Sequence, residues 1–239
     1  MSKEEKNLIV NGKRLDGRLP EDMRKIEMEV GVVKRANGSA HVSFGNTVVI
    51  TSVFGPKETF PRRLQEPEIG VLKCRYSMAP FSVDDRKRPG PSRRSAEISK
   101  VTRLAFEPAI FLKEFPNAGI EIYIEVLQAD GSTRVTGINA ASIALAEAGA
   151  PMRDLITACS VGKIEGTIVA DIAGDEDKTG EADIAFAMMP NKGLVTLLQM
   201  DGILTKEELK KALKLAESCC KKIYKKQKEV LKEKYKKVD

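Results

Sequence analysis

The segment Ile120–Ala129 limits the possible folds more than any other, because over residues 120–126 aliphatic residues alternate with Glu121, Tyr123 and Glu125. A β-strand puts successive side chains on opposite faces, so this alternation predicts a strand with one buried and one more polar face. Small residues follow at 137–148 and end at Gly149, which is typical of a helix with a glycine just beyond its end. The chain therefore contains a predicted strand and helix that are joined by Asp130–Arg134, with the sequence DGSTR.

Further strands are predicted on both sides of this unit. Apolar alternation or continuity indicates strands over 26–33, 39–44, 47–54, 70–76, 156–163, 167–171, 182–189 and 194–199. The dipeptide Asn37-Gly38 is typical of a tight hairpin turn. The segments 57–68 and 79–91 are charged and contain prolines, so we expect them to form loops.

Two further helices complete the pattern. Ser92 is a favourable first residue for one helix, and Thr205–Glu208 forms a capping box for a long helix at the end of the chain. The segment Pro151–Asp154 separates two halves, each with strands followed by a helix. We therefore expect two domains, residues 1–150 and 151–239.

Composition excludes several classes of protein. With 239 residues, 42% of them hydrophobic and 31% charged, the chain can bury a substantial core. No apolar run approaches the roughly 18 residues of a membrane span, and residues 1–6 lack the apolar core of a signal peptide. The four cysteines form no CxxC pair, which favours reduced thiols. We therefore expect a cytoplasmic protein that does not interact with membranes.

The chain has a single histidine, His41, which limits the kinds of metal site and catalytic centre that it can contain. One histidine cannot supply a metal site with several imidazoles, and it makes a Ser-His-Asp or Cys-His centre a poor hypothesis. A structural or surface role is the more common one for such a residue.

Charge is segregated along the chain. Residues 57–103 contain 12 basic and 6 acidic side chains, residues 104–204 contain 6 and 15, and residues 205–239 contain 13 and 6. The overall net charge is +6. Basic blocks of this kind are found in proteins that bind polyanions, and also on ordinary solvated surfaces.

Two segments have features of an anion site. A helix that begins near Asp130–Arg134 would present free N–H groups, and Gly131 and Ser132 would let a ligand approach the backbone. Thr133 and Arg134 can donate hydrogen bonds to phosphate oxygens; an ordinary capped turn is the alternative. The pair Arg93-Arg94 opposes the dipole of its own helix, which favours an anionic ligand or simply a solvated basic turn.

An acidic segment supplies the remaining candidates, because six carboxylates occur within the thirteen residues 171–183. Crowded carboxylates raise one another's pKa values and can act as acid or base, or bind Mg²⁺. An acidic surface loop is the alternative. Asp183 is the exception, because it lies at the start of a predicted strand.

These features occur together in a known family. The chain resembles the RNase PH family of phosphorolytic 3′→5′ exoribonucleases over about residues 12–235, and within it the branch found in the archaeal exosome. The segments that carry the resemblance are Gly12–Arg18, Gly38–Ala40, Gly45–Thr47, Arg75–Ser82, Pro91–Ser99, Glu125–Asp130, Asp177–Asp183 and Leu197–Gly202. Each is weak alone, but their order and spacing are specific.

The resemblance implies that inorganic phosphate is the co-substrate and attacks the 3′ end of single-stranded RNA, releasing nucleoside diphosphates. In reverse, nucleoside diphosphates would extend a 3′ tail. Arg94, Gly131, Ser132, Thr133 and Arg134 would bind the phosphate, with Arg94 also counted among the catalytic residues. The family usually has glycine at the position of Ser132, which leaves open whether the hydroxyl takes part.

The resemblance also assigns the acids and the RNA contacts. Asp177 would be the general acid, and Asp183 would support it or, with Asp177, hold Mg²⁺. Arg62, Arg63 and Arg93 would bind the RNA backbone without regard to sequence.

The implied fold is α+β and RNase PH-like, of the type described as ribosomal protein S5 domain 2-like. Two related halves would each have a mixed sheet packed by helices. The implied partners are a paralogous non-catalytic subunit in a hexameric ring and S1/KH-type RNA-binding cap subunits. The alternatives are a homohexameric enzyme that trims tRNA 3′ ends, and a non-catalytic ring subunit that only binds RNA.

Overall fold

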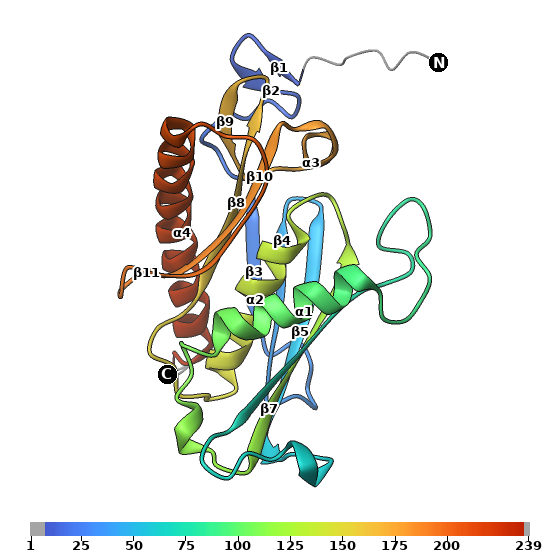
Figure 1. Ribbon diagram of the computed structural model, residues 1–239, viewed down its shortest axis with the longest axis vertical. Helices are drawn as coiled ribbons and strands as arrows, with labels where there is room; N and C mark the ends of the chain where they lie inside the picture. The colour runs from blue at the N-terminus through green and yellow to red at the C-terminus, as the bar shows by residue number, and fades with distance from the viewer. Residues whose placement is uncertain (1–7, 237–239) are drawn as a thin grey trace.

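Two β-sheets pack on different sides of one buried helix, α2 (Thr133–Glu147), and this arrangement positions the other elements (Figure 1). The structure is a computed structural model that describes residues 8–236. The predicted lack of a signal peptide in residues 1–6 lies outside the described residues. Within residues 8–236, no helix is both long enough and apolar enough to cross a membrane.

The first sheet has five strands, all from residues 26–128. In spatial order they are β3 (Ile26–Val30), β4 (Gly38–Phe44), β5 (Thr47–Glu58), β7 (Ala118–Gln128) and β6 (Val71–Met78). All neighbours are antiparallel except β6 and β7. A parallel pair needs a crossover connection, and this one contains α1 (Arg93–Phe106) and the short 3-10 helix η2 (Leu112–Glu114).

The second sheet has four antiparallel strands from residues 157–202. In spatial order they are β11 (Leu194–Gly202), β10 (Ala182–Met189), β8 (Thr157–Ile164) and β9 (Thr167–Ala170). The long helix α4 (Lys206–Lys234) packs against this sheet, and the predicted capping box of Thr205 and Glu208 is present. A small ribbon, β1 (Ile9–Val10) and β2 (Lys13–Arg14), precedes both sheets.

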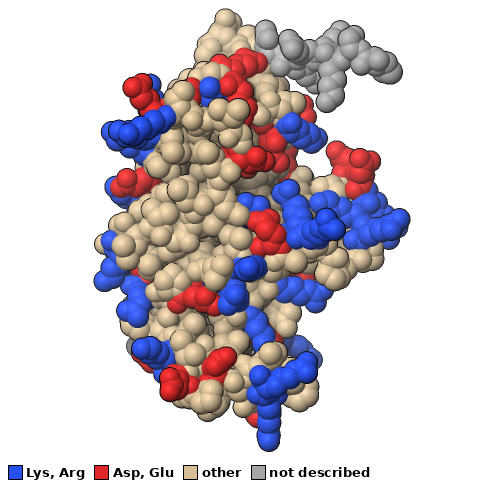
Figure 2. All heavy atoms as spheres, in the orientation of Figure 1, with Lys and Arg blue, Asp and Glu red and all other residues tan. Residues whose placement is uncertain are grey.

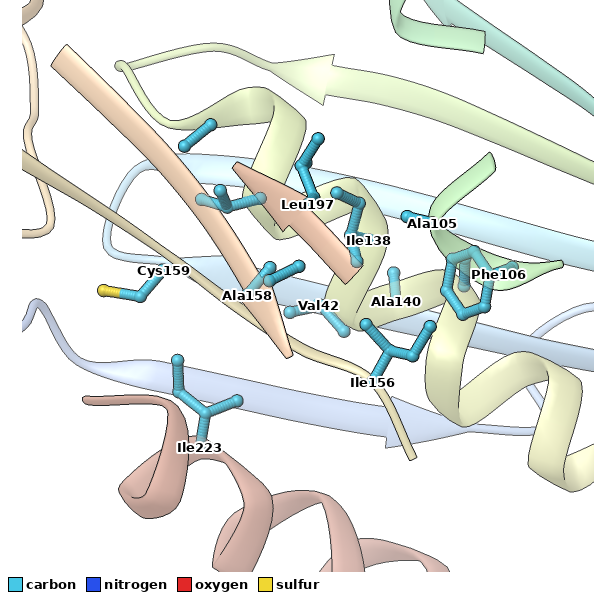
Figure 3. Close-up of a cluster of buried hydrophobic side chains, with 14 of the residues drawn as sticks. Val42, Ala105, Phe106, Ile138, Ala140, Ile156, Ala158, Cys159, Leu197 and Ile223 are labelled. Carbon is cyan, nitrogen blue, oxygen red and sulfur yellow. The ribbon is translucent and has the colours of Figure 1, made fainter. Parts of the chain in front are cut away.

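Helix α2 is buried on nearly every side. Twelve of its 15 residues are buried, whereas a surface helix normally buries one apolar stripe. It packs against β4 and β5 of the first sheet and against β8 and β10 of the second. Figure 3 shows Ile138 of α2 among side chains that come from both sheets, α1 and α4. A single core therefore joins the two sheets.

Close approach, rather than a turn, explains Gly38. A Cβ atom at Gly38 would lie 2.1 Å from the carbonyl oxygen of Ala144 and 2.4 Å from the amide nitrogen of Ala148, so only glycine lets β4 pass this close to α2. Gly38 is the first residue of β4, and β3 ended at Val30. The prediction of a tight Asn37-Gly38 hairpin turn was therefore wrong.

Three other boundaries differ from the sequence predictions. Helix α2 begins at Thr133 rather than near residue 137, because its first turn contains no apolar periodicity to mark it. Strand β5 extends to Glu58, into a predicted loop, and the 3-10 helix η1 (Arg62–Leu64) follows. The acidic segment contains the short helix α3 (Asp175–Thr179). The predicted starts of α1 after Ser92 and of α4 after Thr205 are confirmed.

Polar contacts fix α2 to its surroundings. The fully buried Asn139 donates from Nδ2 to the carbonyl oxygen of Ala158 (2.7 Å) and accepts at Oδ1 from the amide of Ala158 (3.0 Å). Gln227 of α4, also fully buried, donates to the same Oδ1 at 3.1 Å. One side chain therefore connects α2 to both β8 and α4.

We expect Asn139→Ala to lower the free energy of unfolding by about 2–4 kcal/mol, because it leaves several buried polar groups without partners. Urea denaturation is the measurement. Asn46→Ala is the control, because Asn46 is exposed and makes one hydrogen bond, to Asp130 at 3.2 Å; it should cost less than about 0.5 kcal/mol. Equal stability of the two variants would contradict this account of α2.

Candidate active site

One pocket brings together most of the residues predicted to bind phosphate or donate protons. Its volume is about 350 Å³, and α1, α2, α3 and the strands β10 and β11 surround it. The predicted residues that line it are Arg94, Ser132, Thr133, Arg134, Asp177 and Asp183. They come from segments far apart in the chain, so the pocket exists only because α2 brings the two sheets together.

The N-terminus of α2 supplies the central feature of this pocket. No side chain caps the helix at Ser132, and the first turn contains no acidic residue. The first bond of the helix runs from the amide of Thr136 to the carbonyl of Ser132. The N–H groups of Thr133, Arg134 and Val135 therefore have no partner within the helix, and free N–H groups at a helix N-terminus, with the helix dipole, favour an anion.

The geometry of the preceding loop shows what the hydroxyl of Ser132 contacts. Gly131 and Ser132 both have positive φ, +74° and +58°, a conformation that glycine adopts most easily. Ser132 is stabilised there because its hydroxyl contacts the carbonyl oxygen of Ile172 and Oγ of Ser160, both at 2.5 Å. The hydroxyl is therefore held by protein groups, and Ser132 offers the pocket its backbone.

Arg134 is held in place by two neighbours. Its guanidinium donates to Gln199 of β11 and, at 3.3 Å, to Glu97 of α1, while Gln199 donates to Glu97 at 2.9 Å. Its Nε atom is buried and has no hydrogen-bond partner within the described residues. Arg134 is therefore held at the pocket wall with one donor unpaired.

Thr133 is oriented from the opposite direction. The buried Tyr76 of β6 donates its hydroxyl to Oγ1 of Thr133 at 2.9 Å. Burial raises the pKa of Tyr76 above its usual value, so the phenol stays protonated. The first sheet therefore also contributes to the start of α2.

Asp183 is the most perturbed carboxyl group of the site. Burial, followed by the nearby charge of Asp177, raises its pKa to about 6, although Arg134 and Arg94 act in the opposite direction. Its Oδ1 atom is buried and has no hydrogen-bond partner within residues 8–236. An unpartnered buried carboxyl oxygen beside two arginines is a functional-site feature rather than a stabilising one.

The acidic segment divides into three roles. Asp177 lies on α3 and is exposed at the edge of the pocket. Asp171 and Glu176 are buried and form ion pairs with arginines of residues 14–24. Asp175 is exposed and lies near Lys178. The acidic segment is therefore not simply a surface loop, because it contains buried ion pairs and a residue that lines the pocket.

Arg94 lines the pocket from the start of α1, and Arg93 next to it is exposed. Figure 2 shows basic side chains gathered where the loop before α1 leaves the body of the protein. The structure does not bring Arg62 and Arg63 to the pocket. They lie on η1, and Arg63 lines a separate cavity of about 990 Å³ that contains none of the pocket's charged residues.

Sequence reasoning did not single out several residues of the site. Tyr76, Ser160, Gln199 and Asp201 contact or line the pocket. Tyr76 and Gln199 lie in segments that carried the family resemblance, which was a signal for them. Ser160 lies within a buried strand and had no distinguishing pattern.

Three carboxyl groups line the pocket, those of Asp177, Asp183 and Asp201, and the first two are the residues predicted to hold a metal ion. The described part of the chain contains no group of three His, Cys, Asp or Glu residues arranged to hold one. Mg²⁺ commonly uses only one or two carboxylates and completes its coordination with water and substrate phosphates. The unpartnered Oδ1 of Asp183 suits such a ligand.

The chain belongs to the RNase PH family of 3′ exoribonucleases. The model of the family's domain 1 matches residues 22–151. The model of its domain 2 matches residues 154–219. These two matches cover most of the chain and confirm the predicted family.

Individual relatives are more specific. The chain is 58% identical over 228 residues to the exosome complex component Rrp41 of Pyrococcus furiosus, covering 95% of this chain and 91% of the relative. It is 54% identical over 231 residues to Rrp41 of Methanopyrus kandleri, covering 97% of each. The crystal structure of rice Rrp46 superposes with a TM-score of 0.82 at 22% identity, covering 91% of this chain and 100% of the other. This superposition confirms the RNase PH-like α+β fold.

The raised pKa of Asp183 predicts a dependence of stability on pH. The folded state holds the proton up to about pH 6, whereas the usual value is 3.8. The stability that this proton provides is therefore present below about pH 4 and is lost as the pH rises through about 6. Asp183→Asn does not ionise, so relative to wild type it should gain on the order of 2 kcal/mol between pH 4 and pH 8.

Chemical denaturation at the two pH values measures this difference. Asp175→Asn is the control, since Asp175 is an exposed carboxyl group outside the pocket. It should change stability by less than about 0.5 kcal/mol at either pH. A pH-independent effect of Asp183→Asn would show that Asp183 is not protonated near pH 6.

Proposed function

We propose that this chain is the catalytic subunit of an exosome ring and degrades RNA from its 3′ end by phosphorolysis. One observation carries this proposal. The uncapped N-terminus of α2, the guanidinium groups of Arg94 and Arg134, and the carboxyl groups of Asp177 and Asp183 face one pocket. The first three favour a phosphate nucleophile, and the last two can supply a proton.

Phosphate would bind at the start of α2. The N–H groups of Thr133, Arg134 and Val135, with Arg94 and the free Nε of Arg134, would contact its oxygens. An oxygen of the bound phosphate then attacks the phosphorus of the last phosphodiester bond. The bond to the 3′ oxygen of the preceding nucleotide breaks, and a nucleoside diphosphate leaves.

The departing 3′ oxygen needs a proton. We assign its donation to Asp177, which lies at the edge of the pocket where RNA would enter. Bound phosphate and the scissile phosphodiester add negative charge, and such charge favours protonated carboxyl groups. Asp183 is already shifted in this direction. In the reverse reaction the same group accepts the proton of the 3′ hydroxyl while a nucleoside diphosphate extends the RNA.

Mg²⁺ would be held by Asp183 together with phosphate oxygens and water, because a metal ligand must be deprotonated and Asp177 is assigned the proton. When bound, it would neutralise negative charge on the reacting phosphates. The residues of the chain retain their own tasks, since Arg94 and Arg134 orient the phosphate and Asp177 moves the proton.

Partners follow from the relatives, whose names describe components of an exosome complex. We propose a hexameric ring with a paralogous non-catalytic subunit, S1/KH-type cap subunits, and a location in the cytoplasm. Exposed apolar side chains on the edge strand β11, among them Leu198 and Met200, support burial against another subunit. Residues 1–150 and 151–239 are the two proposed domains.

The assay uses the purified ring and RNA labelled at its 3′ end. We expect the label in nucleoside diphosphates, and only when inorganic phosphate is present. Release of nucleoside monophosphates without phosphate would contradict phosphorolysis. If the chain alone forms an active hexamer on tRNA precursors, the tRNA-trimming alternative is correct.

Asp177→Asn should lower kcat about 10²–10⁴-fold, because the leaving oxygen would lose its proton donor. RNA affinity should change less than about twofold, since the variant removes no donor to phosphate. Asp175→Asn on the same helix does not line the pocket and serves as the control. Wild-type phosphorolysis by Asp177→Asn would support a role in RNA binding only, or a different acid.

Arg62 and Arg63 are proposed to bind the RNA backbone, and both are exposed. The double variant Arg62→Gln with Arg63→Gln should weaken RNA binding and reduce the slope of log affinity against log salt by about 2. The KM for phosphate should stay unchanged, because η1 lies outside the phosphate pocket. Lys192→Gln, on the β10–β11 turn, is the matched loss of an exposed positive charge. An equal loss of RNA affinity in the Lys192→Gln control would show that Arg62 and Arg63 do not bind RNA specifically.

A further inference from the structure

Arg24 has a largely buried side chain that the reaction scheme above does not use. It lies just before β3, and its side chain is only 7% exposed. Its ion-pair partner, Asp171, is 1% exposed. Burying a charged pair is expensive unless every polar atom finds a partner, so the contacts of Arg24 indicate what the pair does.

One set of contacts reaches the acidic segment. Arg24 donates from Nε and from its backbone N–H to Oδ2 of Asp171, both at 2.8 Å, and from Nη2 to Oδ1 at 2.7 Å. This is a two-pronged pairing that only a guanidinium can make. Asp171 has a positive φ of +53°. The pairing therefore holds an unfavourable backbone conformation four residues before α3.

A second set of contacts reaches the phosphate loop. Nη1 of Arg24 donates to the carbonyl oxygen of Asp130 at 2.6 Å. Asp130 is also held through its amide by Oγ1 of Thr47 at 3.0 Å, and the same hydroxyl donates to the carbonyl of Gly131 at 2.7 Å. Arg24 therefore joins the loop that begins α2 to the segment that leads to Asp177.

The two joined segments are in direct contact. A Cβ atom on Gly131 would lie 2.9 Å from Cα of Ala173, so no side chain separates them. Beyond this contact, Glu176 of α3 is fixed by Arg14, which is 2% exposed and donates from Nε to Oε1 at 2.7 Å. The same guanidinium donates to the carbonyl oxygens of Ala170 at 2.5 Å and Asp171 at 2.8 Å, so Arg14 ties α3 to the start of the 171–174 segment.

We infer that Arg24 is a positioning residue that sets the spacing between the phosphate-binding end of α2 and the acid on α3. This inference rests on the proposed phosphorolysis. Helix α2 is fixed by the core, so the phosphate site keeps its shape without Arg24. Asp177 does not keep its position without Arg24, because its distance from the reacting phosphate depends on the joined segments.

Misplacement of a catalytic group by about 1 Å can cost about 10²-fold in rate. Arg24→Lys retains the positive charge but cannot pair with Asp171 and Asp130 at the same time. We therefore expect its kcat to fall 10- to 100-fold, in phosphorolysis and in the reverse reaction alike. The KM for phosphate should stay within about threefold of wild type.

Arg18→Lys is the matched control. Arg18 also contacts Asp171, through Nη1 at 3.2 Å to the carbonyl oxygen and at 3.4 Å to Oδ2. Within the described residues it makes no hydrogen bond to residues 130–134. This variant removes hydrogen bonds to the same Asp171 but leaves the connection to the phosphate loop intact. Its kcat should therefore stay within threefold of wild type.

The rates are measured on assembled rings, at a temperature where circular dichroism shows both variants folded. A selective loss of kcat in Arg24→Lys supports the inference. Equal kcat values in the two variants, or a rise in the KM for phosphate with unchanged kcat, would overturn it. If wild-type rings release no nucleoside diphosphate, the proposed function fails first, and that result is distinct from either outcome.

Discussion

The burial of α2 between two sheets is the constraint on which the rest of the structure depends. A helix enclosed on nearly every side needs small residues, and Gly137 is one of them. Its buried polar side chains must find partners within the protein, as Asn139 does with Ala158. Its N-terminus receives no cap and opens into a pocket. Unsatisfied N–H groups at the end of a firmly held helix form an anion site that does not have to reorganise when a ligand binds.

Charged side chains of both signs surround the pocket. Arginines approach the pocket from α1 and α2, while three carboxyl groups approach from α3, β10 and β11. Burial keeps Asp183 partly protonated near pH 6, although arginines lie nearby. A second group of arginines, in residues 14–24, forms ion pairs with the buried Asp171 and Glu176. The basic residues of this chain therefore fall into two groups, one that lines the pocket and one that pairs with the acidic segment.

Much of this could be predicted from the sequence, and the omissions have physical reasons. Alternation in Ile120–Ala129 identified β7, and the caps at Ser92 and Thr205 identified two helix starts. The start of α2 was predicted only approximately, near Asp130–Arg134, because no capping side chain marks Thr133 as its first residue. The tasks of Arg24 and Gly38 depend on partners more than 100 residues away in the chain. Local patterns contain no information about such contacts, and the roles of the site residues came from family resemblance.

We propose that the N-terminus of α2 binds the attacking phosphate. A crystal structure of the ring soaked in inorganic phosphate tests it directly. The account predicts a phosphate about 3 Å from the N–H groups of residues 133–135 and in contact with Arg94 and Arg134. Phosphate bound only elsewhere, for example in the larger cavity beside Arg63, with nothing at the start of α2, would contradict it.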